Sequence, residues 1–455
     1  MCQAQHVAAI TRALCRRKMP LSGVAGRRRA VRCQSTVAAA PHAAKSAPVQ
    51  SAYVHLPFCK RVCHYCDFPV HAVGKNPTAE HTQHKIRDYV ELVRREIELT
   101  ENEGSGPLRT IFFGGGTPSL VPPPLLASII DTLRARYGIA DGAEIAMEAD
   151  PGTFDQQRME AYLAAGVNRV TMGVQSFNDA QLEKCGRTHR TAEVFAAIDA
   201  VKAAGVPSWG LDLMSGLPGQ TLATYQEGLR RAVDAGAHHI SCYDLQVEDG
   251  TPFARWYEPG VAPLPDEPSA ADMFCAASRV LTAAGYEHYE VSNFALPGHR
   301  CRHNWAYWSG AAFLGVGVGA TSFLRRRRVA RPRTIPAYER WVEEFAASGG
   351  GVPGLRDVPP EDDAEMLLDA VMLRLRTADG LDLDEVGREY GEDAKGRIWS
   401  ALAPHVAEGR VVAEGSSGPV PAVARLTSPG GFLVSNDVIA DVFAALGDVS
   451  CAPAV

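Results

Sequence analysis

Cys59, Cys63 and Cys66 form a group of potential metal ligands with the spacing C-x3-C-x2-C. Thiolates are soft ligands, and they suit iron–sulfur clusters as well as zinc. Three cysteines bound to a [4Fe–4S] cluster leave one iron without a protein ligand, open to a small molecule. Structural zinc usually has four protein ligands in paired C-x2-C units. The spacing therefore favours an iron–sulfur cluster over zinc or a chance grouping.

Polar side chains come at or near the ends of several expected strands. In barrel-like α/β proteins the carboxyl ends of the strands build the functional site. A glycine-rich stretch (FGGGTP, residues 113–118) follows the second strand, and its backbone can approach a ligand closely. The polar candidates are Thr117, Glu148, Gln175, Arg187 and Asp212. One edge of the expected sheet should therefore carry the binding residues.

The elements that position these residues alternate between short apolar runs and amphipathic helical patterns. Strands are expected at residues 52–56, 110–113, 144–148, 169–174, 209–213 and 239–245. Helices are expected at residues 86–100, 123–137, 192–204 and 221–235. Such repeats form right-handed βαβ units with a parallel sheet. About six units predict an open, partial α/β barrel, which the runs 286–291 and 313–318 extend.

A glycine- and proline-rich stretch at residues 348–354 marks a boundary between two parts of the chain. We expect a core domain at 49–347, a linker at 348–360 and a C-terminal domain at 361–455. In the last part, helices are expected at 362–376, 384–390 and 437–446, and short strands at 410–414 and 424–426. This order predicts a small α+β, winged-helix-like module.

The first segment of the chain differs from the rest in charge. Residues 1–50 carry nine Lys or Arg and no carboxylate, so with a net charge of −6 the remainder carries −15. An Arg-rich, acid-free segment without a long apolar stretch is typical of an organelle transit peptide, here residues 1–48. A disordered tail is the alternative. As a transit peptide, residues 1–48 favour the chloroplast over the mitochondrion because the segment is rich in Ala and Ser.

The remaining composition excludes several classes of protein. No run of about 18 apolar residues is present, so no membrane span is expected. A body that acidic is poorly suited to nucleic acid, whose phosphates need a basic face. Eleven scattered cysteines argue against a disulfide scaffold and for a reducing compartment.

The cysteine spacing and the strand-end residues together resemble the radical-SAM superfamily. The resemblance implies a partial (β/α)6 TIM-like barrel that binds S-adenosylmethionine at the open iron of a [4Fe–4S] cluster. It implies a cleavage of the sulfonium driven by one electron, and hence an electron donor. The S-adenosylmethionine residues that the resemblance implies are Tyr53, Tyr65, Gly115, Gly116, Thr117, Glu148, Gln175, Arg187 and Asp212.

Within that superfamily the chain resembles the oxygen-independent coproporphyrinogen III oxidases and their haem-chaperone relatives, from about residue 53 to residue 446. True oxidases usually carry a further cysteine where this chain has Phe68, and their N-terminal extension helps to hold substrate. The stretch HNWAYW (residues 303–308) resembles the haem-binding motif of the chaperone branch. The resemblance therefore favours a haem chaperone with His303, Tyr307 and Trp308 at the haem.

Several points stay open at this stage. A histidine packed under tryptophans is the alternative to a haem ligand, and Cys301 is an alternative ligand or attachment point. Many relatives have histidine where this chain has Thr321, which leaves a ligand role for that loop in doubt. The basic run at residues 325–328 could meet haem propionates or an acidic partner, or be solvated. The competing functions are the oxidase and a cluster-bearing scaffold without catalysis or haem transfer. For the chaperone, the partners would be haem, an unknown acceptor protein and the electron donor.

Overall fold

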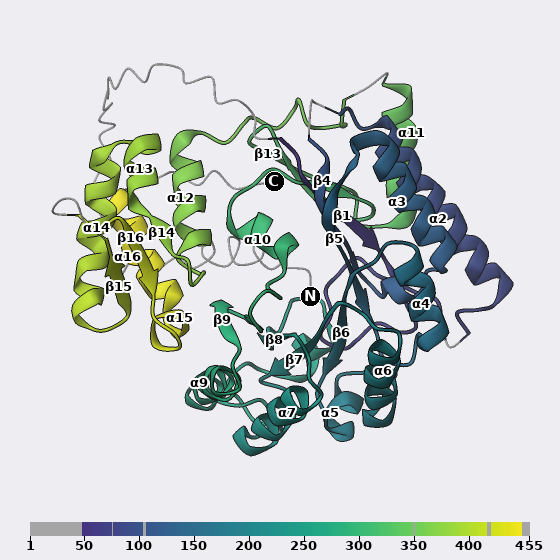
Figure 1. Ribbon diagram of the computed structural model, residues 1–455, viewed down its shortest axis with the longest axis horizontal. Helices are drawn as coiled ribbons and strands as arrows, with labels where there is room; N and C mark the ends of the chain where they lie inside the picture. The colour runs from purple at the N-terminus through teal and green to yellow at the C-terminus, as the bar shows by residue number, and fades with distance from the viewer. Residues whose placement is uncertain (1–47, 75, 103–105, 349–350, 416–419, 448–455) are drawn as a thin grey trace, which may run out of the picture.

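The computed structural model describes residues 48–74, 76–102, 106–348, 351–415 and 420–447. Its main feature is a curved nine-stranded sheet with the order β11-β1-β4-β5-β6-β7-β8-β10-β9 (Figure 1). The expected transit peptide lies outside the described residues.

Six neighbouring strands of the sheet run parallel, as the strand–helix alternation predicts. They are β1 (Ser51–Leu56), β4 (Leu108–Gly115), β5 (Ile139–Ala149), β6 (Arg169–Gln175), β7 (Ser208–Ser215) and β8 (His239–Asp244). The helices that follow these strands are α2 (Glu80–Leu99), η1 (Pro118–Leu120), α3 (Pro123–Tyr137), α4 (Gln156–Ala164), α5 (Asp179–Lys184), α6 (Thr191–Ala203), α7 (Leu222–Asp234), α8 (Pro252–Trp256) and α9 (Glu267–Ala283).

The sheet stays open at both edges. On one side β10 (Asn293–Ala295) pairs antiparallel with β8 and β9 (Glu287–Glu290). On the other, β11 (Leu314–Val316) joins β1 in parallel. The described strands β9 and β11 do not pair with each other. The expected partial, TIM-like α/β barrel is therefore confirmed.

Helices α2, α3, α4 and α6 cover the convex face of the sheet (Figure 1). The apolar side chains between these layers form the largest core, which includes Val54, Ile111, Met147 and Val170. These residues are each next to a polar residue that faces the other way, namely His55, Thr110, Glu148 and Arg169. None of the described helices has the length and apolar content that a membrane crossing requires.

The concave face of the sheet holds a short helix, α10 (Arg302–Trp308), which lies between the sheet and α12 (Asp363–Arg374) (Figure 1). After α10 come β11, the hairpin of β12 (Thr321–Leu324) and β13 (Arg327–Ala330), and α11 (Ile335–Ala347). Two short strands, β2 (Phe58–Cys59) and β3 (His71–Ala72), pair beside β1.

The C-terminal part has a core of its own, which includes Val371, Leu402 and Ile439. Its other elements are β14 (Leu381–Asp382), α13 (Leu383–Tyr390), α14 (Glu392–Ala407), β15 (Val411–Glu414), β16 (Val423–Leu426), α15 (Gly430–Leu433) and α16 (Ser435–Leu446). Helices beside a three-stranded antiparallel sheet match the expected α+β module.

Candidate functional site

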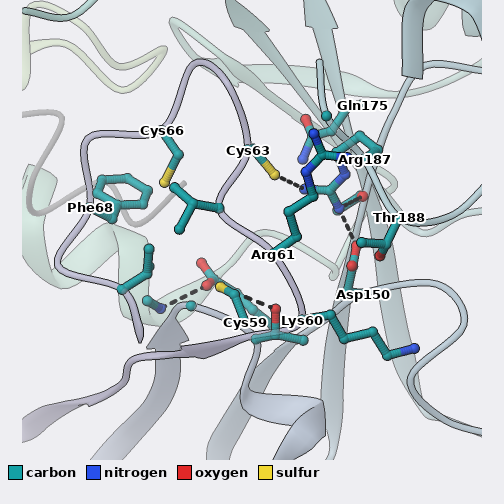
Figure 2. Close-up of a pocket in the computed structure, with 18 of the residues that line it drawn as sticks. Cys59, Lys60, Arg61, Cys63, Cys66, Phe68, Asp150, Gln175, Arg187 and Thr188 are labelled. Carbon is teal, nitrogen blue, oxygen red and sulfur yellow. Dashed lines mark hydrogen bonds and ion pairs between the residues drawn. The ribbon is translucent and has the colours of Figure 1, made fainter. Parts of the chain in front are cut away.

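The three cysteines lie in the segment that follows β1. Cys59 ends β2, and the turn that carries the other two is closed by a hydrogen bond from Cys66 N to Cys63 O (3.2 Å). The three sulfur atoms lie around a shared space (Figure 2). Among the described residues, no three His, Cys, Asp or Glu side chains lie close enough to hold a single metal ion. The binding of a [4Fe–4S] cluster by these three thiols stays a prediction.

Polar side chains from the loops after β4 and α5 hold two of these sulfurs. Thr117 Oγ1 donates a hydrogen bond to Cys59 Sγ (3.6 Å), and Arg187 Nη1 donates to Cys63 Sγ (3.3 Å). Burial raises the pKa of the Cys66 thiol to about 12. A thiolate at this position therefore needs a positive partner, which the iron of a cluster would supply.

One pocket collects most of the expected binding residues (Figure 2). Its lining includes Cys59, Cys63, Tyr65, Cys66, Gly115, Gly116, Thr117, Glu148, Gln175, Arg187 and Asp212. Phe68, at the position of the oxidases' further cysteine, lies in the same wall. Most of these residues come from the carboxyl ends of the parallel strands or from the loops that follow them, because all of those ends meet at one edge of the sheet.

The glycines of residues 114–116 are required by the chain's own packing. A Cβ on Gly115, whose φ is +114°, would lie 2.4 Å from the ring of His55. A Cβ on Gly116 would lie 2.6 Å from the backbone of Pro57. These glycines let the strand end pass directly over β1 and its following loop. The ligand approach expected from the sequence is therefore not their only function.

Two carboxylates lie deep in the pocket. Gly115 N donates a hydrogen bond to Glu148 Oε2 (3.0 Å), which fixes that side chain at the end of β5. Burial raises the pKa of Glu148, and the nearby Asp212 adds to the rise. Burial raises the pKa of Asp212 as well. Hydroxyl groups of a bound ligand would relieve this desolvation by donating hydrogen bonds.

Arg187 is engaged by the protein itself, through a residue that the sequence reasoning did not select. Its Nη2 forms an ion pair with Asp150 and donates to Gly173 O (2.7 Å). Burial acts to raise the pKa of Asp150, but Arg187 and His189 outweigh it and hold that pKa below its ordinary value. Arg187 therefore ties the cysteine loop to β5 and β6. Asp150 could have been selected from the sequence, because it comes two residues after Glu148, at the end of the same expected strand.

Gln175 and Tyr53 occupy different surroundings. Gln175 lines the pocket and has a φ of +67°, the left-handed region that few residues other than glycine adopt. Such local strain is concentrated at functional sites. Tyr53 is not among the pocket residues, because its hydroxyl bonds His55 Nδ1 (3.0 Å) and its ring stacks on Phe112 inside the barrel.

The expected haem residues lie away from this pocket, on α10. His303, Tyr307 and Trp308 are almost fully buried, at 0%, 4% and 2% exposed. Both ring nitrogens of His303 are occupied: Nδ1 bonds Thr110 Oγ1 (2.9 Å) and Nε2 bonds Tyr307 OH (2.8 Å). Burial lowers the pKa of His303 to about 3, so the imidazole is neutral. Its role as a haem ligand stays a prediction, and it requires that one of these hydrogen bonds break.

Glu144, a second residue missed by sequence reasoning, holds the start of α10. It accepts hydrogen bonds from Arg302 N (3.2 Å), His303 N (3.0 Å) and Cys301 Sγ (3.6 Å). Arg169 lies 3.8 Å from its carboxylate, on the next strand. Glu144 and Glu148 share one face of β5 because they are four residues apart. This even spacing was the sequence signal that Glu144 faces the barrel interior, as Glu148 does.

The C-terminal domain closes over the other side of α10. Trp308 packs against Met372 and Leu373 of α12, and the guanidinium of Arg374 lies 4.8 Å from the Trp305 ring centroid. Among the described residues, Trp308 Nε1 is buried and has no hydrogen-bond partner. Five of the seven residues of α10 are buried, so protein side chains surround the motif.

The basic run of residues 325–328 contacts the protein's own acidic residues. Arg326 pairs with Asp363 at the start of α12 (2.7 Å), and Arg328 pairs with Glu361 and Asp369. We call these five residues the hairpin clasp. They join the β12–β13 hairpin to α12 and the residues just before it. Binding of haem propionates or of an acidic partner by this run stays a prediction.

Comparison with known proteins agrees with this arrangement. Residues 53–232 match the family model of the radical SAM superfamily. The haem chaperone HemW of Synechocystis is 39% identical over 406 residues, which are 87% of this chain and 97% of the relative. HemW of Escherichia coli is 40% identical over 60% of this chain and 70% of the relative. The mouse protein called radical S-adenosyl methionine domain-containing protein 1, mitochondrial, is 32% identical over 75% and 76%.

Among solved structures, coproporphyrinogen III oxidase (HemN) from Escherichia coli matches with a TM-score of 0.70. The match covers 87% of this chain and 90% of the oxidase at 22% identity, and it supports the shared fold alone. The sequence similarity to HemW of Synechocystis extends over 97% of that protein. The chain therefore belongs to the HemW family of the radical SAM superfamily.

Proposed function

We propose that this protein is a haem chaperone that binds a [4Fe–4S] cluster, S-adenosylmethionine and haem, and passes haem to an acceptor protein. The observation that carries the proposal is the joint presence of the three-cysteine pocket and the HNWAYW helix in a chain of the HemW family. The acceptor and the electron donor are partners of the proposal.

In this proposal Cys59, Cys63 and Cys66 hold the cluster, which supplies one-electron chemistry at the sulfonium of S-adenosylmethionine. Glu148 and Asp212 accept hydrogen bonds from the ligand's hydroxyls, since the half-buried Glu148 and the buried Asp212 both line the pocket. The other contacts assigned to this ligand are from Tyr65, Gly115, Gly116, Thr117, Gln175 and Arg187, which all line the pocket. The contact expected from Tyr53 would require its side chain to leave His55 and Phe112. Arg187 keeps the cysteine loop in place through Cys63 and Asp150, so its contact to the ligand would be shared with those groups.

At the other end of the barrel, His303 supplies the axial nitrogen, and Tyr307 and Trp308 cover the ring. A neutral imidazole suits this role, and burial keeps His303 neutral. Haem would enter only when α12 moves away from Trp308, because the motif is filled in the closed arrangement. Opening of the C-terminal domain is therefore a step of the proposed transfer.

The proposal also covers the domain boundaries of the chain and the cellular compartment of the protein. We assign residues 49–347 to the core domain, 348–360 to the linker and 361–455 to the C-terminal domain. We assign residues 1–48 to import into an organelle, with the chloroplast preferred, although the similar mouse and cattle proteins are named mitochondrial. A fluorescent protein fused to residues 1–50 tests the assignment, and diffuse cytosolic fluorescence would contradict it.

The oxygen-independent coproporphyrinogen III oxidase is the second candidate, because a protein of that name shares the fold. Phe68 in the pocket wall, where the oxidases usually have a cysteine, counts against it. A cluster-bearing scaffold protein with neither catalysis nor haem transfer is the third candidate.

Two parallel assays on the anaerobically reconstituted protein separate these functions. We expect haem to bind with a defined Soret band, and we expect no conversion of coproporphyrinogen III to the divinyl product. His303→Ala should lower the haem affinity and alter the Soret band while the cluster is retained, and His84→Ala on the exposed face of α2 is the control. Porphyrinogen turnover would favour the oxidase, and a protein without haem binding would favour the scaffold.

A further inference from the structure

His299 lies in the loop between β10 and α10, four residues before His303. It is partly exposed, whereas His303 is fully buried. Its Nδ1 bonds Ser208 Oγ (3.0 Å), and its Nε2 has no hydrogen-bond partner among the described residues. Histidines that bind metal usually form a hydrogen bond through the other ring nitrogen, which fixes the orientation of the ring. His299 therefore presents an oriented ring nitrogen at the surface.

The ring of His238 stacks on that of His299, with 4.3 Å between the centroids and 10° between the planes. Trp209 N can only donate, and it donates to His238 Nδ1 (3.2 Å), so the proton of a neutral His238 is on Nε2. The partner of His299 is a hydroxyl, which can accept as well as donate. Only His299 can therefore offer the lone pair of its Nε2 without losing its hydrogen bond to the protein.

Both rings are neutral near pH 7. Burial lowers the pKa of His238, and the neighbouring His299 and Arg169 lower it further. Burial and Arg169 lower the pKa of His299 in the same way. A neutral imidazole is the form that binds a metal.

A single lone pair suits haem iron better than a free metal ion. Haem iron already has four porphyrin nitrogens, so one protein nitrogen can hold it. Zinc sites need three or four protein ligands. Among the described residues, no His, Cys, Asp or Glu side chain joins this pair in a group of three that could hold a metal ion. The ligand class that fits His299 is therefore an iron porphyrin.

The surroundings of His299 lead to the base of α10. A cleft of about 380 Å3 lies beside this loop, and its lining includes Gly298, Arg300 and Glu144. Three arginines and two glutamates line it, so charge does not select the ligand here. Glu144 also accepts a hydrogen bond from His303 N (3.0 Å). The cleft therefore connects the surface at His299 with the helix that carries the expected axial ligand.

We propose that His299 is the first protein ligand of incoming haem, which then passes to His303. The first step forms a bond between the iron and Nε2 of His299 and releases a water molecule from the iron. The second step breaks that bond and forms the bond to His303, and the iron keeps its oxidation state throughout. His303 cannot be the first ligand, because both of its ring nitrogens are bonded inside the protein. The inference rests on the proposed chaperone function and adds an entry point that needs no opening of the C-terminal domain.

Stopped-flow mixing of the full chain with ferric haem, followed at the Soret band, tests this order. We expect a fast phase whose rate rises with haem concentration, and a slow phase that does not depend on it. His299→Ala should remove the fast phase and slow association about tenfold or more, because only the open minor form could then accept haem. The final affinity should change little, since His303 remains. His303→Ala should keep the fast phase and lose the slow one.

The matched control is His84→Ala on the exposed face of α2, which should leave both phases unchanged. His238→Phe keeps a ring against His299 but no second imidazole, and it should retain the fast phase. Wild-type kinetics in His299→Ala would overturn the inference, and so would a single wild-type phase that only His303→Ala alters. Loss of the fast phase in His238→Phe but not in His299→Ala would move the ligand to His238 and also overturn it. Absence of haem binding in the wild type is a different outcome, which would refute the chaperone function together with this inference.

Discussion

The two ends of the barrel interior differ although the same strands build them. At the carboxyl ends, cysteines, carboxylates and glycine backbone surround a pocket. At the amino ends, α10 fills the space, and every polar atom of the His303 ring has a partner. On β4, Thr110 touches His303 and Gly115 touches Glu148, so about 16 Å of strand separates the two regions.

This difference indicates that the two regions bind their ligands in different ways. The cysteine pocket is preorganised, because its side chains are fixed by one another before any ligand arrives. In the α10 region the buried side chains already contact other parts of the protein, so a ligand there must displace these contacts. Its apparent affinity is lowered by the population of the closed form.

The largest expected effect is the loss of the cluster. Cys59→Ser, Cys63→Ser and Cys66→Ser should each abolish the visible absorption and the EPR signal of the reduced cluster. Haem binding at α10 should persist, since that region lies at the other end of the strands. The control is Cys275→Ser on α9, which should retain iron and sulfide. Full iron and sulfide in all three variants would refute the cluster assignment.

Sequence reasoning located the pocket end well because local signals determine it. The strand–helix alternation predicted the parallel order, and parallel strands bring their carboxyl ends to one edge. Glu148, Gln175 and Asp212 follow their strands, so their proximity could be expected. The ion pair of Arg187 with Asp150 was not predicted, because its two residues are 37 positions apart and either could have been solvated.

The α10 end was harder to predict because its surroundings come from distant parts of the chain. The motif revealed His303, but Thr110 lies 193 positions away. The cover by α12 and the pairing of Arg328 with Asp369 are tertiary contacts without periodic signals. Helix α9, before the motif, and helix α14, after it, were not among the expected helices.

The second largest expected effect is a loss of stability when the α10 end of the barrel is altered. Glu144→Gln removes the charge that holds the start of α10 and leaves Arg169 buried without its carboxylate partner. We expect a loss of about 3 kcal/mol in the free energy of unfolding, measured by urea denaturation. The exposed Glu258→Gln is the control and should change stability little. A stable variant with unaltered haem binding would show that Glu144 does not organise this region.

A smaller effect concerns the hairpin clasp. Arg328→Ala removes two ion pairs that hold α12, and each partly exposed pair contributes at most about 1 kcal/mol. If opening limits haem entry, haem association should accelerate by up to about thirtyfold, and salt should accelerate the wild type in the same direction. Stopped-flow haem binding measures this, with Arg230→Ala on α7 as the control. An unchanged rate in the variant and in high salt would mean that haem enters without domain opening.

The smallest expected effect identifies which ring nitrogen of His303 would bind the haem iron. Tyr307 OH occupies Nε2, so Tyr307→Phe frees that nitrogen while the ring remains to cover the macrocycle. A neutral hydrogen bond is worth about 0.5–1.5 kcal/mol. If Nε2 is the ligand atom, haem affinity should therefore rise about threefold in a Soret titration, because the ligand no longer competes with Tyr307. Thr110→Val frees Nδ1 instead and serves as the matched comparison. A rise in Thr110→Val alone would assign the ligand to Nδ1, and a rise in neither would move the axial ligand away from His303, with Cys301 the next residue to test.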